Sequence, residues 1–379
     1  GHEGPRIAGR TSETEMTRVK APRAFEDVFK WFETRIDPFA QRDIVRPPQS
    51  LLAFYAHFVR QAWPAFAILL VAGFLGSVIE AALMAFIGSL VDLMRTAKSP
   101  QAFFSDNGAY LVFMAFVAMI ARPLVSMLHD LVKNQMIAGP FTTLIRWQTH
   151  TYVLRQSLGF FQNDFAGRVA TRVIQLGPAV RDVAANTCDV VVWVVVHWIG
   201  AMLLFFQADK WLALPLLVWL VGYIISLTYF VPRIEKLSAE MSEARSMLTG
   251  RIVDSYTNMA TVKLFAHTDR EDDYARGAFT EFLDRYKQQL RLNSVMEVVL
   301  WTLNGLVLVV TTGLAIWLWT RGLVTVGAIA LVTGLIIRLM NMSGWFMWTL
   351  AQIFDNIGVV QESMLAISRP HEVVDRPAA

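Results

Sequence analysis

Long apolar runs alternate with polar stretches along most of the chain. Six of these runs approach the roughly 20 residues that an α-helix needs to cross a hydrocarbon core of about 30 Å. Backbone N–H and C=O groups cannot stay unpaired in lipid, so each run is predicted to be a transmembrane helix. The predicted spans are residues 65–93, 109–128, 190–206, 211–231, 295–320 and 326–350.

The connections between the predicted spans are of two kinds. Residues 94–108, 207–210 and 321–325 are short, whereas residues 129–189 and 232–294 are long polar stretches of similar length. Apolar residues in the second stretch recur at steps of three and four, which predicts amphipathic helix. We therefore expect two helical hairpins that project about 40 Å beyond the membrane. The periodic residues are Ile234, Leu237, Met241, Ala244, Leu248 and Ile252.

Composition and charge agree with a membrane protein and predict its orientation. Hydrophobic residues make up 55% of the chain and charged residues only 17%, which is too little charge to cover so much apolar surface in water. Lys and Arg concentrate before the first span and in the two long connections. The positive-inside rule then places both termini and both hairpins in the cytoplasm of a multi-pass protein of the inner or plasma membrane.

The first 50 residues are predicted to be a cytoplasmic segment with one short helix near residues 25–35. They contain no apolar core typical of a signal peptide. Residues 1–15 precede the first methionine, Met16, and we interpret them as a remnant of cloning. Residues 51–60 are short, aromatic and amphipathic, and are predicted to form an elbow helix in the membrane interface.

Several kinds of chemistry are not predicted for this sequence. The single cysteine, Cys188, excludes a disulfide within the chain and a cysteine-cluster metal site. The histidines lack the close pairing of zinc sites. No G-x-x-x-x-G-K-[ST] phosphate loop occurs. We therefore expect no catalytic residue, metal or cofactor in this chain, and no nucleic-acid partner.

Three charged residues lie inside predicted spans, where a charge costs about 2.5–3.5 kcal/mol on insertion scales. Glu80, Arg122 and Arg338 all fall at a depth of about 18–21 Å from the outer ends of their helices. One interpretation is an internal ion pair, Glu80 with Arg122. The other places some of these side chains on the wall of a substrate pathway, together with Asn304, Asn341 and Trp345.

The tips of the two hairpins are predicted where polar and Gly residues interrupt the apolar pattern. This places them at residues 157–167 (SLGFFQNDFAG), with two exposed aromatics, and at residues 249–258. The order of these tips and of the six spans is similar to that of a known family. Residues 51–377 resemble the transmembrane domain of an ATP-binding cassette (ABC) exporter of the six-helix, domain-swapped kind. The matching stretches are Gly159-Phe160-Phe161 with Gly167-Arg168 and Thr171-Arg172, residues 250–279, and Ala366-Ile367-Ser368-Arg369-Pro370 with Asp375-Arg376-Pro377.

The resemblance implies an all-α membrane protein that forms a domain-swapped dimer, with a second copy of itself as partner. Residues 51–368 would be the transmembrane domain and residues 369–379 the start of a linker to a nucleotide-binding domain that this sequence lacks. ATP and Mg would bind to that domain, so the full-length transporter, not this polypeptide alone, is expected to be a translocating ATPase. Span 6 lines the pathway in this family, which makes Arg338 the strongest substrate-contact candidate. The residues expected to couple to the nucleotide-binding domain are Phe160, Phe161, Asp164, Gly167, Arg251, Asp254 and Tyr256.

The leading functional interpretation is the translocation domain of an ATP-driven exporter that moves an amphipathic compound, a lipid or a peptide out of the cytoplasm by alternating access. A gradient-driven transporter or channel is the alternative, and it predicts inverted repeats and broken helices near the midplane. A membrane scaffold without transport is a third possibility. The two matched hairpins favour the exporter, since neither of the other classes requires them.

Overall fold

The computed structural model describes residues 23–40, 46–163, 166–264 and 268–370. Within these ranges every regular element is a helix, as the sequence predicted. Six helical stretches are long and apolar enough to cross a membrane, and together they contain all six predicted spans. They are formed by α3 Trp63–Thr96, α4 to α6 Pro100–Val153, α8 Ala166–Ala208, α9 Ala213–Thr257 with the turn Lys210–Leu212 before it, α11 Thr268–Thr320 and α12 Val326–Ile367.

Two short helices precede the first span. α1 (Arg23–Glu33) and α2 (Leu51–Val59) fall at the predicted N-terminal and elbow helices. The hydroxyl of Ser50 accepts a hydrogen bond from the backbone N–H of Ala53 at 3.3 Å and so caps α2. A 3₁₀ turn, η1 (Arg60–Ala62), then leads directly into α3.

The second span is a continuous helix whose pitch changes twice. Two π-helical stretches interrupt it, and each adjoins a proline: Pro123 follows the first and Pro140 lies within the second. A proline removes one backbone donor and crowds the preceding turn, and a wider turn relieves that crowding. The elements in order are α4 (Pro100–Phe116), η2 (Val117–Ala121), α5 (Arg122–Leu131), η3 (Val132–Phe141) and α6 (Thr142–Val153).

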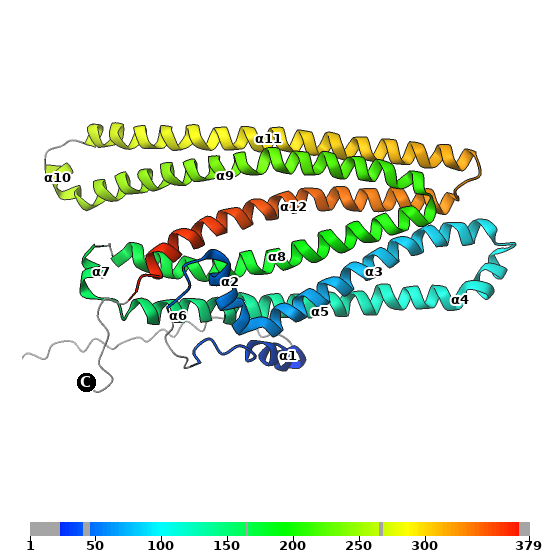
Figure 1. Ribbon diagram of the computed structural model, residues 1–379, viewed down its shortest axis with the longest axis horizontal. Coiled ribbons are helices and arrows are strands. Elements are labelled where there is room, and N and C mark those ends of the chain that lie inside the picture. The colour runs from blue at the N-terminus through cyan, green and yellow to red at the C-terminus, as the bar shows by residue number, and fades with distance from the viewer. Residues whose placement is uncertain (1–22, 41–45, 164–165, 265–267, 371–379) are drawn as a thin grey trace, which may run out of the picture.

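Two helical arms extend beyond the spans, as predicted. α9 and α11 run side by side and are joined by α10 (Met259–Leu264), forming the paired arm at the top of Figure 1. α6 and α8 form the second arm and are joined by α7 (Leu158–Asn163). Between α8 and α9, the 3₁₀ turn η4 (Lys210–Leu212) closes a short connection at the end of the molecule opposite the arms (Figure 1). We call this the outer end of the spans, and the end that carries the arms the inner end.

The position of the second tip differs from the prediction. Residues 249–257, predicted to form the tip, remain helical as the last turns of α9, and the chain reverses only after Asn258. Gly250 suggested a break, but a glycine at an exposed helix position costs only about 1 kcal/mol relative to alanine. Packing of α9 on α11 is sufficient to offset that cost.

The buried core has two parts. One joins the elbow helix, η3, α6, α8 and the end of α12 around the fully buried Phe54, Phe58 and Phe141. The other lies among the outer halves of α8, α9, α11 and α12, around Phe205 and Leu216. Large apolar side chains elsewhere on the spans remain exposed, which suits a surface that faces lipid.

The outer ends of α3 and α12 approach so closely that only glycine fits between them. A Cβ atom on Gly88 would lie 2.9 Å from the carbonyl oxygen of Gly327, and one on Gly327 would overlap Gly88 and Asp92. The Asp92 carboxylate accepts hydrogen bonds from the backbone N–H of Gly327 at 2.7 Å and from the hydroxyl of Thr325 at 2.6 Å. The first turn of α12 is therefore capped by a side chain from α3.

The inner end of α12 is fastened to the elbow and to α6. Arg46 donates to the carbonyl oxygen of Ser368 at 2.9 Å. Tyr152 and Gln156 donate to the carbonyl oxygen of Arg369 at 2.6 and 3.0 Å. Ser368, the last residue of the predicted transmembrane domain, and Arg369, the first residue of the predicted linker, therefore both contact that domain.

Candidate functional site

A cluster of charged side chains joins four spans and brings together the three charged residues that were predicted to share a depth. Arg122 on α5 donates to Oε1 of Glu80 on α3 at 3.2 Å. His197 on α8 lies 3.2 Å from Oε2, and Arg338 on α12 pairs with the same oxygen. The ion pair between Glu80 and Arg122, one of the two interpretations of the sequence, is present.

One carboxylate thus faces two guanidinium groups and an imidazole. The Glu80 side chain is only 13% exposed, while Arg122 is 52% and Arg338 33% exposed. Trp193 stacks on His197 with a centroid separation of 5.2 Å, and its ring lies 5.8 Å from the Arg338 guanidinium. The buried charge is compensated, and the exposed side of the cluster carries the positive excess.

A second ionic cluster was not predicted. Asp189 on α8 is buried and lies 3.0 Å from Nε2 of His129 on α5. Lys133, at the start of η3, pairs with the other carboxylate oxygen. All three residues lie in the long polar connection 129–189, which was predicted to form a helical hairpin beyond the membrane, so a charge there gave no signal. The structure shows that this connection is a continuation of the membrane helices.

Asn304 holds α9, α11 and α12 together. Its amide oxygen accepts from the indole N–H of Trp219 at 3.0 Å, and its amide nitrogen donates to the hydroxyl of Ser343 at 2.9 Å. Tyr223 donates to the carbonyl oxygen of Ser343 at 3.0 Å. All of these side chains are buried. Satisfied polar networks of this kind fix helix positions because a broken one leaves buried groups unpaired.

The other predicted pathway residues on α12 lie apart from these networks. Asn341 and Trp345 are exposed, Trp345 to 42%. They share the helix with Arg338 but face outward in a single copy of the chain.

The first tip differs from its prediction in the exposure of its aromatics. Phe160 is only 8% exposed, and Phe161 packs edge-on against it at 5.2 Å. The preceding residue, Leu158, is the exposed one at 73%. The aromatics join the core of the arm because α7 is short and lies flat across its end. Asp164 lies outside the described residues, and Gly167 falls in the first turn of α8.

The three candidate residues at the second tip differ in their contacts and in their exposure. Arg251 donates to the carbonyl oxygen of Tyr274 at 3.1 Å and lies 4.6 Å from the centre of its ring, so it fastens α9 to α11. The carbonyl oxygen of Asp254 accepts from Asn258 at the end of α9. Tyr256 is 71% exposed and is therefore free to meet another surface.

Six spanning helices, charges paired between spans and two long helical arms define a multi-pass membrane domain of the transporter class. The chain belongs to the ABC transporter family: the model for the ABC transporter transmembrane region matches residues 66–343.

Relatives and solved structures agree with this assignment. The chain is 34% identical over 357 residues to an uncharacterized ABC transporter ATP-binding protein of Haemophilus influenzae, covering 94% of this chain and 58% of that protein. It is 26% identical over 220 residues to putative multidrug export ATP-binding/permease proteins of Staphylococcus aureus, covering 58% of this chain and 38% of those proteins. A bacterial Atm1-family ABC exporter with ATP bound shares the fold, with a TM-score of 0.67 and 16% identity over 85% of this chain and 56% of that one. The chain thus spans little more than half the length of its Haemophilus relative.

Proposed function

We propose that this chain is the translocation domain of an ATP-driven exporter that moves an amphipathic compound, a lipid or a peptide out of the cytoplasm by alternating access. The two arms are the observation that carries the proposal. They extend well past the spanning segments and end in short cross-helices, α7 and α10. A channel or gradient-driven carrier has no use for such arms, whereas a domain driven by a separate ATPase needs a surface that receives its motion.

ATP and Mg are assigned to a nucleotide-binding domain, since the sequence contains no phosphate loop. The partners in this proposal are two such domains, a second copy of the chain and the lipid bilayer. The inner or plasma membrane is the proposed location, with both termini in the cytoplasm. This orientation follows from the Lys and Arg residues that accumulate in the N-terminal segment and in the arms.

Within the arms, α10 and Tyr256 are the proposed contact with the nucleotide-binding domain, together with α7. Arg251 would act indirectly by keeping α9 and α11 in register, since its guanidinium is engaged with Tyr274. Within the membrane, the exposed sides of Arg122 and Arg338 are the proposed polar elements of the pathway. Asn304 would shape its wall.

The test replaces Tyr256 with alanine in a polypeptide that continues this chain into the ATP-binding part of the Haemophilus relative. In inside-out vesicles, ATP hydrolysis should persist while ATP-dependent uptake falls by about tenfold, because a central aromatic anchor commonly carries that much interaction energy. Tyr110→Ala, at an exposed tyrosine near the outer end of the membrane domain, is the matched control and should leave both rates unchanged. Normal coupling in Tyr256→Ala would remove α9 from the proposed contact.

A further inference from the structure

A cavity of about 460 Å³ opens between α9, α11 and α12 on the cytoplasmic side of Asn304. Its volume lies within the range of about 300–1,000 Å³ that is usual for small-molecule sites. Asn304 and Ser343, which form the buried network described above, close the end of the cavity that lies deepest in the membrane, while Trp301 and Trp348 lie at its rim.

The charge of this cavity has one sign. Glu297 and Asp355 are the only charged side chains among the described residues that line it. Arg233, on the same face of the membrane, is engaged with Tyr229, whose carbonyl oxygen it meets at 2.6 Å. Arg245 acts on Asp355 from outside the cavity and lies 5.9 Å from the ring of Phe282. An anionic ligand would meet two carboxylates here, Glu297 and Asp355, and no cationic side chain among the described lining residues.

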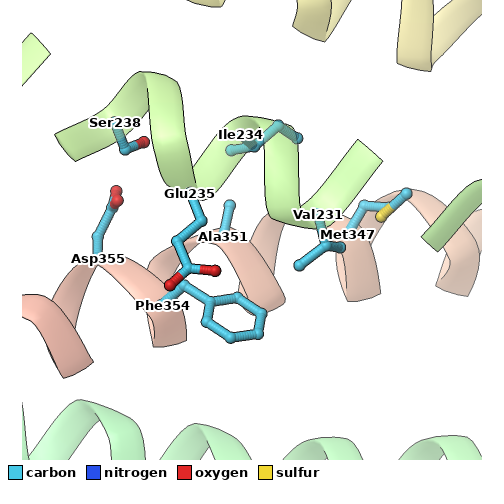
Figure 2. A pocket seen from close by; sticks show the side chains of 8 residues that line it. All are labelled: Val231, Ile234, Glu235, Ser238, Met347, Ala351, Phe354 and Asp355. Atoms are coloured by element: carbon cyan, nitrogen blue, oxygen red, sulfur yellow. The ribbon is translucent and has the colours of Figure 1, made fainter. Parts of the chain in front are cut away.

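The Asp355 carboxylate is held in place by neighbours on the other two helices. Ser238 on α9 hydrogen-bonds to it, and Gln289 on α11 donates to the Ser238 hydroxyl at 2.9 Å. Figure 2 shows Ser238 and Asp355 facing each other across the seam between α9 and α12, with the carboxylate of Glu235 nearby. The negative end of the cavity is thus built from all three helices.

The lining changes character with depth. Asn304 lies about 24 Å and Glu297 about 35 Å along α11 from its outer end at Thr320, and Asp355 lies about 44 Å along α12 from Val326. For a hydrocarbon core of about 30 Å, the carboxylates fall at the inner interface and the opposite end of the cavity lies within the membrane. The deeper lining includes Met340 and Leu300.

The aromatic and sulfur side chains suit the same kind of ligand. Trp301 is 71% and Trp348 67% exposed, so their ring faces are available at the rim. Indole faces attract cations, and methionine side chains adapt to irregular apolar groups. By contrast, Arg122 and Arg338 are engaged with Glu80, and neither residue lines this cavity.

We propose that this cavity binds a cationic amphiphile, with its positive group beside Glu297 and Asp355 and its apolar part among the tryptophan and methionine side chains. The identification of this ligand as transported cargo rests on the proposed export function, but its binding does not.

The test measures binding of tetraphenylphosphonium to the 379-residue chain in phosphatidylcholine nanodiscs by calorimetry, with empty nanodiscs subtracted. Glu297→Gln and Asp355→Asn should each weaken binding by about tenfold, and added salt should weaken it further in the unmodified chain. Glu281→Gln removes another exposed carboxylate from the same helix α11, away from the cavity, and should leave binding unchanged. Tetraphenylborate, of the same shape and opposite charge, should bind poorly to the unmodified chain and better to Glu297→Lys.

Equal binding of the two probes, or unchanged tetraphenylphosphonium binding in both carboxylate variants, would overturn the proposal. If a cationic double-chain lipid in the nanodisc competes with tetraphenylphosphonium, the natural ligand comes from the bilayer. If it does not compete, the ligand comes from the aqueous phase. Both results support a cation site in this cavity. Because no nucleotide is present in this binding experiment, a negative result would not contradict the proposal of ATP-driven export. Loss of ATP-dependent uptake would be a separate result.

Discussion

At the scale of single residues, Glu80 is the group on which the membrane charges depend. Its carboxylate faces Arg122, His197 and Arg338 from three other helices. Each of those groups costs free energy within the membrane unless it is paired. Loss of the carboxylate would therefore leave the charges of Arg122 and Arg338 uncompensated on two spans and remove a hydrogen-bond partner of His197 on a third.

Glu80→Gln should lower the free energy of unfolding by about 3 kcal/mol, the lower end of the range for a broken buried ion pair, because both arginines retain some contact with solvent. Glu362→Gln is the matched control. Its carboxylate is 69% exposed and pairs with Arg172 at 3.1 Å, so the same substitution should cost less than about 1 kcal/mol. Thermal unfolding in detergent, followed by size-exclusion chromatography, compares the two variants. Equal melting temperatures would show that the cluster does not stabilise the fold.

The sequence was informative at this scale only where a charge interrupted an apolar run. Glu80, Arg122 and Arg338 could be placed at one depth because helix rise is constant, and the Glu80–Arg122 pair was one of the two interpretations of that placement. The cluster of Asp189, His129 and Lys133 could not be predicted, since charged residues are expected in a polar connection. Which charge pairs with which depends on helix rotation, and apolar periodicity in a fully apolar span does not define it.

At the scale of elements, the outer ends of α3 and α12 approach each other closely. Gly88 and Gly327 bring the two backbones together, and Asp92 caps α12 across the gap. Small residues allow this approach in a membrane, where packing rather than hydrophobic burial drives helix association.

Gly327→Ala should destabilise the membrane domain by about 2–3 kcal/mol, because the new methyl group meets backbone and the Asp92 carboxylate instead of a flexible side chain. Gly313→Ala on α11 should be neutral or slightly stabilising, since open space surrounds that position in the described chain and alanine favours helix. Melting temperatures in detergent measure both. A stable Gly327→Ala variant would mean that the two outer ends separate readily.

Elements were easier to predict than their ends. All six spans and both arms followed from apolar runs and helical spacing, since length alone nearly determines a membrane helix. The second tip was placed too early because Gly250 was interpreted as a break, while Arg251 and its contact with Tyr274 carry the helix through that position. The π-helical turns of the second span were not predicted, since they arise from packing around Pro123 and Pro140.

At the scale of the whole molecule, orientation in the membrane places the arms and the outer turns on opposite sides. The single native cysteine makes this measurable, because Cys188→Ala leaves a chain without reactive thiols. Leu264→Cys, at the end of α10 and 81% exposed, should be labelled by an impermeant maleimide in inside-out vesicles but not in intact cells. Leu323→Cys, 59% exposed in the turn before α12, should show the reverse.

Detergent-permeabilised cells, in which both positions should react, control for accessibility. Labelling of Leu264→Cys in intact cells would invert the proposed topology and place the arms outside.

α11 is so long that a small rotation about one end would move its far end much more than its middle. Its 53 residues span about 80 Å, and the carboxylate of Glu297 belongs to a residue about 35 Å from the outer end. For a straight helix that pivots at that end, a rotation of about 5° would carry the tip at Thr268 through about 7 Å but Glu297 through only about 3 Å. A displacement applied at the tip would thus be more than halved at the cavity, and the force correspondingly multiplied. The same geometry applies in the other direction. If a bound ligand widened the cavity by about 3 Å, the displacement of α10 at the tip would be larger.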